Sequence, residues 1–177
     1  MEHTILNHSQ LITWYILAVL YILHSTKLYA LESDRNLPIQ CSADSMQLKL
    51  KQHRIQCQGN VQITQGTTHV QAAAMIIHSD ANNKLISAVA KGNTTQPAHY
   101  WTITDTQKPE LHAYADVINY LPKHNLIELI GHARIEQDDN QYSAPTIKIN
   151  SLTHTVISHT NSPDLIHITL NNQVNGL

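Results

Sequence analysis

Residues 59–67 read Gly-Asn-Val-Gln-Ile-Thr-Gln-Gly-Thr. Apolar Val61 and Ile63 stand two positions apart, with polar residues before, between and after them. Turn-forming pairs, Gly59-Asn60 and Gly66-Thr67, close the segment on both sides. A period of two is typical of a strand with one face buried and the other in water. The stretch therefore predicts a half-buried strand between two turns.

Similar runs fill the chain after residue 37, and turn signals separate them. No stretch outside the first thirty residues shows the 3.6-residue apolar stripe of an amphipathic helix. The alternating runs include 46–50, 61–63 and 147–149, and the turn signals are at 59–60, 66–67, 82–83, 92–93, 138–140 and 162–163. The sequence therefore predicts an all-β fold.

A short motif, Ala-x-x-[Met/Ile]-x-[Leu/Ile/Tyr], occurs four times, beginning at Ala43, Ala72, Ala115 and Ala144. The first two copies stand 29 residues apart, as do the last two, and the second pair repeats the first at an offset of 72 residues. The same offset aligns Lys51 with Lys123, Ile55 with Ile127, Gly59 with Gly131, Ile63 with Ile135 and Gln65 with Gln137. Strand pairs too small to bury their own apolar faces are expected to stack into an elongated fold. If two such stacks face each other without closing, an apolar slot runs between them and the end strands stay open to strand addition.

The amino-acid composition of the chain argues against some classes of function and predicts which residues form its core. The chain has 177 residues, a one-domain length, with 14% charged residues and a formal net charge of −2. Lys and Arg are scattered, so nucleic acid is not an expected partner. Phe is absent and four of the nine aromatic residues lie in the first thirty positions, so the core is expected to consist of Ile, Val, Leu, Met and Ala.

The first thirty residues resemble a secretory leader. Residues 11–23 are a charge-free apolar run of 13 residues, too short for the roughly 20 residues of a membrane-spanning helix. Cleavage is expected after Ala30, which makes 1–30 a signal peptide, 31–170 the folded domain and 171–177 a flexible tail. The segment before the apolar run has no Lys or Arg, so an uncleaved anchor stays an alternative.

The chain has two cysteines, Cys41 and Cys57. An oxidising compartment permits a bridge between them but does not demand one. The alternative is that both are small buried apolar residues in strands. Cys41 follows Pro38-Ile39-Gln40, which is unlike a lipoprotein cleavage box.

Residues 59–67, followed by Val70 and Ala72, resemble the signature of the LptA (OstA-like) periplasmic lipopolysaccharide transport family. The similarity extends from about residue 37 to about residue 170. Further matching residues are Pro38-Ile39, Gly92, Pro97–Tyr100, His112-Ala113, Tyr120 and Gly131–Arg134. The sequence departs from the family pattern at His132, at Pro145 and at both cysteines. Pro145 has no amide hydrogen, so it is expected to shorten the pairing of its strand.

The resemblance implies an open, slightly twisted antiparallel β-jellyroll built from stacked repeat strand pairs. It implies that the chain binds the lipid A acyl chains of lipopolysaccharide and passes the lipid between the inner and outer membranes, without cofactor or chemistry. The implied partners are an LptC-type inner-membrane protein, an LptD-type outer-membrane protein and head-to-tail copies of the chain. The residues assigned to the lipid groove are Ile39, Cys41, Met46, Leu48, Leu50, Ile55, Cys57, Val61, Ile63, Val70, Met75, Ile77, Ile118, Tyr120, Ile127, Leu129, Ile135, Tyr142, Ile147 and Ile149.

Other chemistry finds little support in the residues. The thirteen histidines are dispersed in the sequence and none stands in a metal-ligand motif, so no metal is expected. His78-Ser79-Asp80 has the residue types of a hydrolytic triad, but neighbours on a strand point to opposite faces. Lys49, Lys51 and Arg54 are close enough in sequence to meet lipid phosphates, with a solvated face as the alternative.

Three further functions compete with a soluble lipid carrier. The first is an LptC-like component of the same pathway that keeps its leader as an anchor. The second is a structural β-solenoid with a fully packed interior and no lipid ligand. The third, a hydrolase, has no supporting constellation of residues.

Overall fold

The computed structural model describes residues 34, 37–104, 108–153, 155–158 and 165–170. These residues form an antiparallel sheet of twelve strands with two short 3-10 turns, which confirms the predicted all-β fold. The elements are β1 (Gln40–Ser42), β2 (Ser45–Lys49), η1 (Leu50–Gln52), β3 (Arg54–Gln65), β4 (Thr68–Ser79), β5 (Leu85–Lys91), β6 (Ala98–Thr102), β7 (Leu111–Ala115), β8 (Val117–Leu121), η2 (Pro122–His124), β9 (Leu126–Gln137), β10 (Asn140–Asn150), β11 (Thr155–Ser158) and β12 (His167–Thr169). The expected signal peptide and tail lie outside the described residues.

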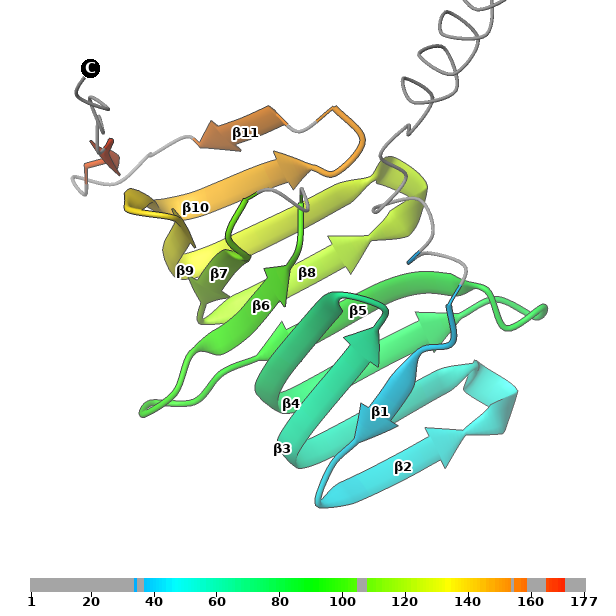
Figure 1. Cartoon of the computed structure of the whole chain (residues 1–177). Coiled ribbons are helices and arrows are strands. Elements are labelled where there is room, and N and C mark those ends of the chain that lie inside the picture. Colours follow the sequence, from blue (N-terminus) through cyan, green and yellow to red (C-terminus); the bar gives the residue numbers. More distant parts are fainter. Residues whose placement is uncertain (1–33, 35–36, 105–107, 154, 159–164, 171–177) are drawn as a thin grey trace, which may run out of the picture.

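Four long strands, β3, β4, β9 and β10, extend across the fold, and each changes its neighbour half-way along (Figure 1). β3 pairs first with β2 and then with β1, whereas β4 pairs first with β6 and then with β5. β9 pairs first with β8 and then with β7, and β10 pairs first with β12 and then with β11. The long strands are thus shared by two wings. The first wing holds β2, β5, β8 and β11, and the second wing holds β1, β6, β7 and β12.

The wings meet along a crease where the long strands bend. In β3 the bend is at Gly59 and Asn60, which have φ of 75° and 45°, and the β3–β4 register shifts there. In β9 it is at Gly131 and His132, with φ of 77° and 45°. Glycine adopts positive φ without steric cost, so these positions allow a strand to turn from one wing into the other.

Pro145 lies at the bend of β10. The β9–β10 register shifts between Ala144 and Thr146, so the proline falls at a bulge where no ladder hydrogen bond is needed from it. β10 continues to Asn150 beyond it. The expected shortening of this strand is therefore wrong, because the bulge accommodates the missing amide.

The predicted offset of 72 residues is present in the elements themselves. β2, η1 and β3 recur as β8, η2 and β9 with the same lengths and the same offset. The two 3-10 turns end at residues of positive φ, His53 and Asn125, which are also separated by the 72-residue offset. The fold is thus a doubled unit, with β1 and β2 at one end of the stack and β10 and β11 at the other (Figure 1).

Small side chains fill the crease. Ala72, Ala115 and Ala144, three of the motif alanines, are buried beside the bends, together with Ala98 and Ala133. Ala98 pairs with Ala115, and Ala133 pairs with Ala144. Because the inner faces of the wings converge there, a methyl group leaves room where a branched side chain would push the wings apart.

Candidate functional site

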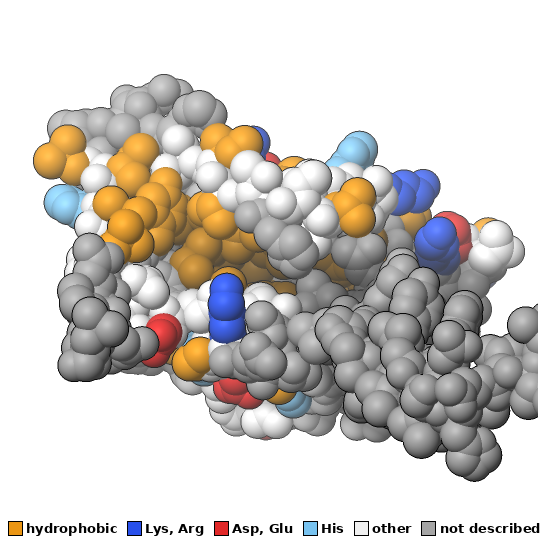
Figure 2. All heavy atoms as spheres, turned by 45° about the horizontal axis from the view of Figure 1, so that its top comes forward, with side chains coloured by type: hydrophobic (Ala, Val, Ile, Leu, Met, Phe, Trp, Pro, Cys, Tyr) orange, Lys and Arg blue, Asp and Glu red, His pale blue; other side chains and the backbone are white. Residues whose placement is uncertain are grey.

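An apolar groove lies between the inner faces of the two wings. Its volume is about 390 Å³, within the roughly 300–1,000 Å³ range of ligand pockets. Figure 2 shows hydrophobic side chains gathered in a hollow on this face of the molecule. The lining residues are Asp34, Ile39, Cys41, Ile55, Ile63, Gln65, Thr68, Val70, Met75, Ile77, Ser79, Asn83, Leu85, Ala88, Ala90, Tyr100, Thr102, Ile118, Tyr120, Ile127 and Ser151.

The strand register builds the groove from continuous cross-strand rows. In the first wing one row runs Leu48, Ile55, Ile77, Ala88, Tyr120, Ile127, Ile149 and Val156. In the second wing the facing row runs Cys41, Ile63, Val70, Tyr100, Ala113, Ile135, Tyr142 and Ile168. Each row crosses its wing from the first edge strand to the last. The apolar alternation seen in the sequence therefore gives each wing an apolar inner row. Part of each row lines the groove: Ile55, Ile77, Ala88, Tyr120 and Ile127 in the first wing, and Cys41, Ile63, Val70 and Tyr100 in the second.

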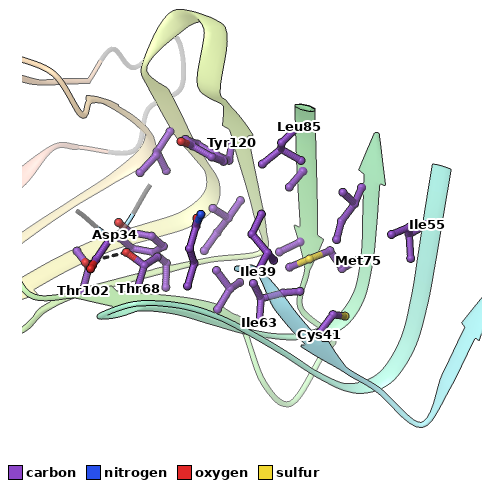
Figure 3. Close-up of a pocket in the computed structure, with 18 of the residues that line it drawn as sticks. Asp34, Ile39, Cys41, Ile55, Ile63, Thr68, Met75, Leu85, Thr102 and Tyr120 are labelled. Carbon is purple, nitrogen blue, oxygen red and sulfur yellow. Dashed lines mark hydrogen bonds between the residues drawn. The ribbon is translucent and has the colours of Figure 1, made fainter. Parts of the chain in front are cut away.

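One region of the groove lining is polar. The Thr68 and Thr102 hydroxyl groups are hydrogen-bonded at 3.0 Å (Figure 3). Asp34, the charged residue of the described lining, accepts hydrogen bonds from the backbone amide and the hydroxyl of Thr67 at 2.9 and 2.5 Å. Burial raises the pKa of Tyr100, so its phenol stays neutral at physiological pH. This part of the lining can offer hydrogen bonds. The rest is mainly apolar, with Gln65, Ser79, Asn83 and Ser151 as its further polar residues.

The structure places the predicted groove residues in three settings. Ten line the groove: Ile39, Cys41, Ile55, Ile63, Val70, Met75, Ile77, Ile118, Tyr120 and Ile127. Seven pack in or against the core without lining the groove: Cys57, Val61, Leu129, Ile135, Tyr142, Ile147 and Ile149. Three are exposed at the β2 end of the stack: Met46, Leu48 and Leu50.

A family model described as "LptA/(LptD N-terminal domain) LPS transport protein" matches residues 40–155. The chain belongs to this family.

Its relatives include the lipopolysaccharide export system protein LptH of Pseudomonas aeruginosa, 31% identical over 125 residues, which are 71% of this chain and 70% of LptH. The lipopolysaccharide export system protein LptA of Escherichia coli K12 is 24% identical over 135 residues, which are 75% of this chain and 70% of LptA. The crystal structure of P. aeruginosa LptH, described as the LptA-homologous periplasmic component of a lipopolysaccharide transport device, matches with a TM-score of 0.70 and 27% identity. The match covers 78% of this chain and 99% of the LptH chain.

These similarities confirm the open β-jellyroll and place the chain in the periplasm as a member of the LptA transport family. Within the described residues, no helix has the length and apolar character needed to cross a bilayer. The apolar run at 11–23 lies outside the residues that the structure describes.

Sequence reasoning missed several groove residues of this LptA-family chain. Ala88 stands between Ile77 and Tyr120 in the first-wing row, and Tyr100 stands beside Val70 in the second-wing row. Ala88 and Ala90 carry only a methyl group, so they give a weak apolar signal in the sequence. Their spacing of two, continuing Leu85-Ile86, was the signal that pointed to a strand with an inward face.

The three residues of the triad-like run point to separate partners. The His78 Nδ1 atom is 3.4 Å from the Ser87 hydroxyl. The Asp80 Oδ1 atom accepts hydrogen bonds from the backbone amides of Asn82 and Lys84, and the Lys84 contact is the main reason why the pKa of Asp80 is lowered. Ser79 lines the groove. Lys49, Lys51 and Arg54 are absent from the described lining.

Three histidines that are dispersed in the sequence meet on the outer face of the second wing. His69 stacks on Trp101 with ring centroids 5.0 Å apart, and His99 stacks on Trp101 at 4.5 Å and on Tyr114 at 4.3 Å. The His99 Nε2 and His112 Nδ1 atoms are 3.0 Å apart. We call His69, His99, Trp101, His112 and Tyr114 the outer ladder. In the described part of the chain, no three His, Cys, Asp or Glu side chains gather as a metal site requires.

Proposed function

We propose that the chain is a non-enzymatic carrier that holds the acyl chains of lipopolysaccharide in the groove between its wings and passes the lipid toward the outer membrane. The observation that carries this proposal is the groove itself, which is open, lined by parts of two cross-strand apolar rows and about 390 Å³ in volume. Membership in the LptA family supports lipopolysaccharide as the ligand. The relatives LptH and LptA are named as lipopolysaccharide export system proteins.

Apolar contact is sufficient to hold such a ligand. Each methylene removed from water contributes about 0.8 kcal/mol, so several acyl chains would bind without precise polar recognition. Because the rows run across every strand of a wing, the lipid meets a similar surface along the stack. That uniformity favours movement along the groove over capture at a single point.

The end strands support docking of like-shaped partners. β1 and β2 pair only with β3, and β11 and β12 pair only with β10, so each has an unpaired edge in the described sheet. Exposed apolar side chains stand at both ends, among them Met46 and Leu48 on β2 and Val156 and Ile157 on β11. Open strand edges of this kind allow strand addition. The proposed partners are therefore further copies of the chain, an LptC-type protein on the inner-membrane side and an LptD-type protein on the outer-membrane side.

Site-specific photocrosslinking in cells tests the carrier function. A photoreactive residue at Ile63 or Tyr120, both in the groove lining, is expected to capture lipopolysaccharide. The same residue at Gln62 or Lys148, both exposed, serves as the matched control and is expected to capture none. Capture at the exposed positions but at neither groove position would refute the proposal.

The form of the amino terminus separates the soluble carrier from an LptC-like anchored protein. Mass analysis of the protein isolated from cells is expected to show a mature chain that begins near Leu31. A full-length chain that retains residues 1–30 would assign the anchored alternative instead. A structural β-solenoid is disfavoured, because it requires a packed interior where the wings leave a groove.

A further inference from the structure

The two cysteines of the chain face each other across the crease. Cys41 lies on β1 in the second wing, opposite Ile63. Cys57 lies on β3 before the bend, between Met46 and Met75 of the first wing. Their Sγ atoms are 3.4 Å apart, although the residues are 16 positions apart in the chain. Figure 3 shows Cys41 beside Ile63 and Met75 in the groove wall.

We propose that Cys41 and Cys57 form an intramolecular disulfide bond in the periplasm and thereby tie the two wings together at the β1–β2 end of the groove. The Sγ atoms are already in contact, and small side-chain rotations close the remaining gap to the S–S bond length of about 2.05 Å. The chain has no third cysteine to compete for either thiol. The periplasm is a compartment in which such bonds form and persist.

The bond forms by thiol–disulfide exchange with an oxidised protein disulfide, the class of oxidant that the periplasm supplies. The Cys41 thiolate attacks one sulfur of the oxidant, which gives a mixed disulfide and releases one oxidant thiol. The Cys57 thiolate then attacks the Cys41 Sγ atom, forms the intramolecular bond and releases the second oxidant thiol. Two thiols of the chain are oxidised, one disulfide is reduced, and both protons end on the oxidant.

Exposure decides the order of attack. Cys57 is fully buried, whereas Cys41 is partly exposed on the edge strand β1, so the oxidant reaches Cys41 first. In the folded chain, burial and the neighbouring Cys57 thiol raise the pKa of Cys41 to about 12. The folded thiol is then almost wholly protonated and exchanges slowly. In the folded chain, oxidation therefore begins at Cys41 and proceeds slowly.

Thiol counting on the full chain tests the proposal. The protein is exported in bacteria, trapped in acid, denatured and treated with a maleimide that adds mass to each free thiol. The wild type is expected to take no label before reduction and two labels after it. The variants Cys41→Ser and Cys57→Ser are expected to take one label in both conditions. Two labels on the unreduced wild type, or a disulfide-linked dimer, would overturn the proposal.

Unfolding measured with and without reductant gives an independent readout. The bond would close the loop between Cys41 and Cys57, which are 16 positions apart. Closing such a loop is expected to lower the unfolding equilibrium constant by on the order of 100-fold. The double variant Cys41→Ser/Cys57→Ser is expected to show the same unfolding midpoint with and without reductant. An unfolding midpoint of the wild type that ignores reductant contradicts the bond. Neither test depends on lipid binding, so the inference and the proposed carrier function can fail separately.

Discussion

Three glycines of positive φ, Gly59, Gly66 and Gly131, lie against aspartate side chains. The side chains of Asp44, Asp34 and Asp116 occupy the space where the Cβ atoms of these glycines would stand. Across the crease, the Asp44 amide donates to the Gly59 carbonyl and the Asp116 amide donates to the Gly131 carbonyl, both at 2.9 Å. The Gly59–Asp44 and Gly131–Asp116 contacts therefore occupy equivalent positions in the two repeats.

The substitution Gly131→Ala is expected to destabilise the fold. Its Cβ atom would lie 2.2 Å from the Asp116 Oδ2 atom, and the backbone would keep a φ of 77°. Holding a non-glycine residue in such a conformation costs about 1–3 kcal/mol, and the contact with the carboxylate adds to that cost. Chemical denaturation should show a lower free energy of unfolding. The variant Gly131→Ala/Asp116→Ala relieves the contact but also removes the hydrogen bond between His132 and Asp116, so it is compared with Asp116→Ala. Against that background, Gly131→Ala should cost less than it does in the wild type; an unchanged midpoint for Gly131→Ala contradicts this account.

Among the elements, β4, β6 and β7 carry the outer ladder, which makes the second wing sensitive to pH. His99 on β6 faces His112 and Tyr114 on β7 and Arg134 on β9. Burial first, then the positive charges of His112 and Arg134, lower the pKa of His99 from 6.5 to about 4. The folded chain therefore favours a neutral imidazole at this position.

The pKa shift predicts a loss of stability in mild acid. Between pH 6.5 and about 4, His99 takes up a proton in the unfolded chain but not in the folded one, so the unfolded chain is favoured as pH falls. Denaturation midpoints measured across this window should fall more steeply for the wild type than for His99→Gln. The control His124→Gln, at an exposed histidine of η2, should keep the wild-type slope. Equal slopes for the wild type and His99→Gln would contradict the prediction.

Over the whole molecule, sequence patterns predicted the repeat and the inward faces but not the depth of each residue. The 72-residue offset anticipated that β8, η2 and β9 would repeat β2, η1 and β3. Alternation assigned both Ile127 and Leu129 to the inner face of β9, yet Ile127 lines the groove whereas Leu129 is fully buried. Apolar alternation with a period of two assigns a residue to one face of its strand. The distance of that residue from the crease depends on where the strand bends, which the alternation does not show. The outer ladder has no signal in the sequence for a related reason, because its contacts between β4, β6 and β7 depend on the strand register.

The ends of the stack determine whether the molecule can extend its groove into a neighbour. Leu48 is 58% exposed on β2, although it begins the first-wing apolar row. Replacing it with Glu places a charge where a docking strand would lie, so Leu48→Glu is expected to reduce head-to-tail self-association by on the order of tenfold. Light scattering over a concentration series measures this change. The control Ile86→Glu places the same charge at an exposed apolar residue of β5, a strand paired on both sides, and should leave self-association unaltered. If both variants associate like the wild type, the β1–β2 edge is not the docking surface. The chain would then carry lipid as a separate molecule and not as part of a continuous bridge.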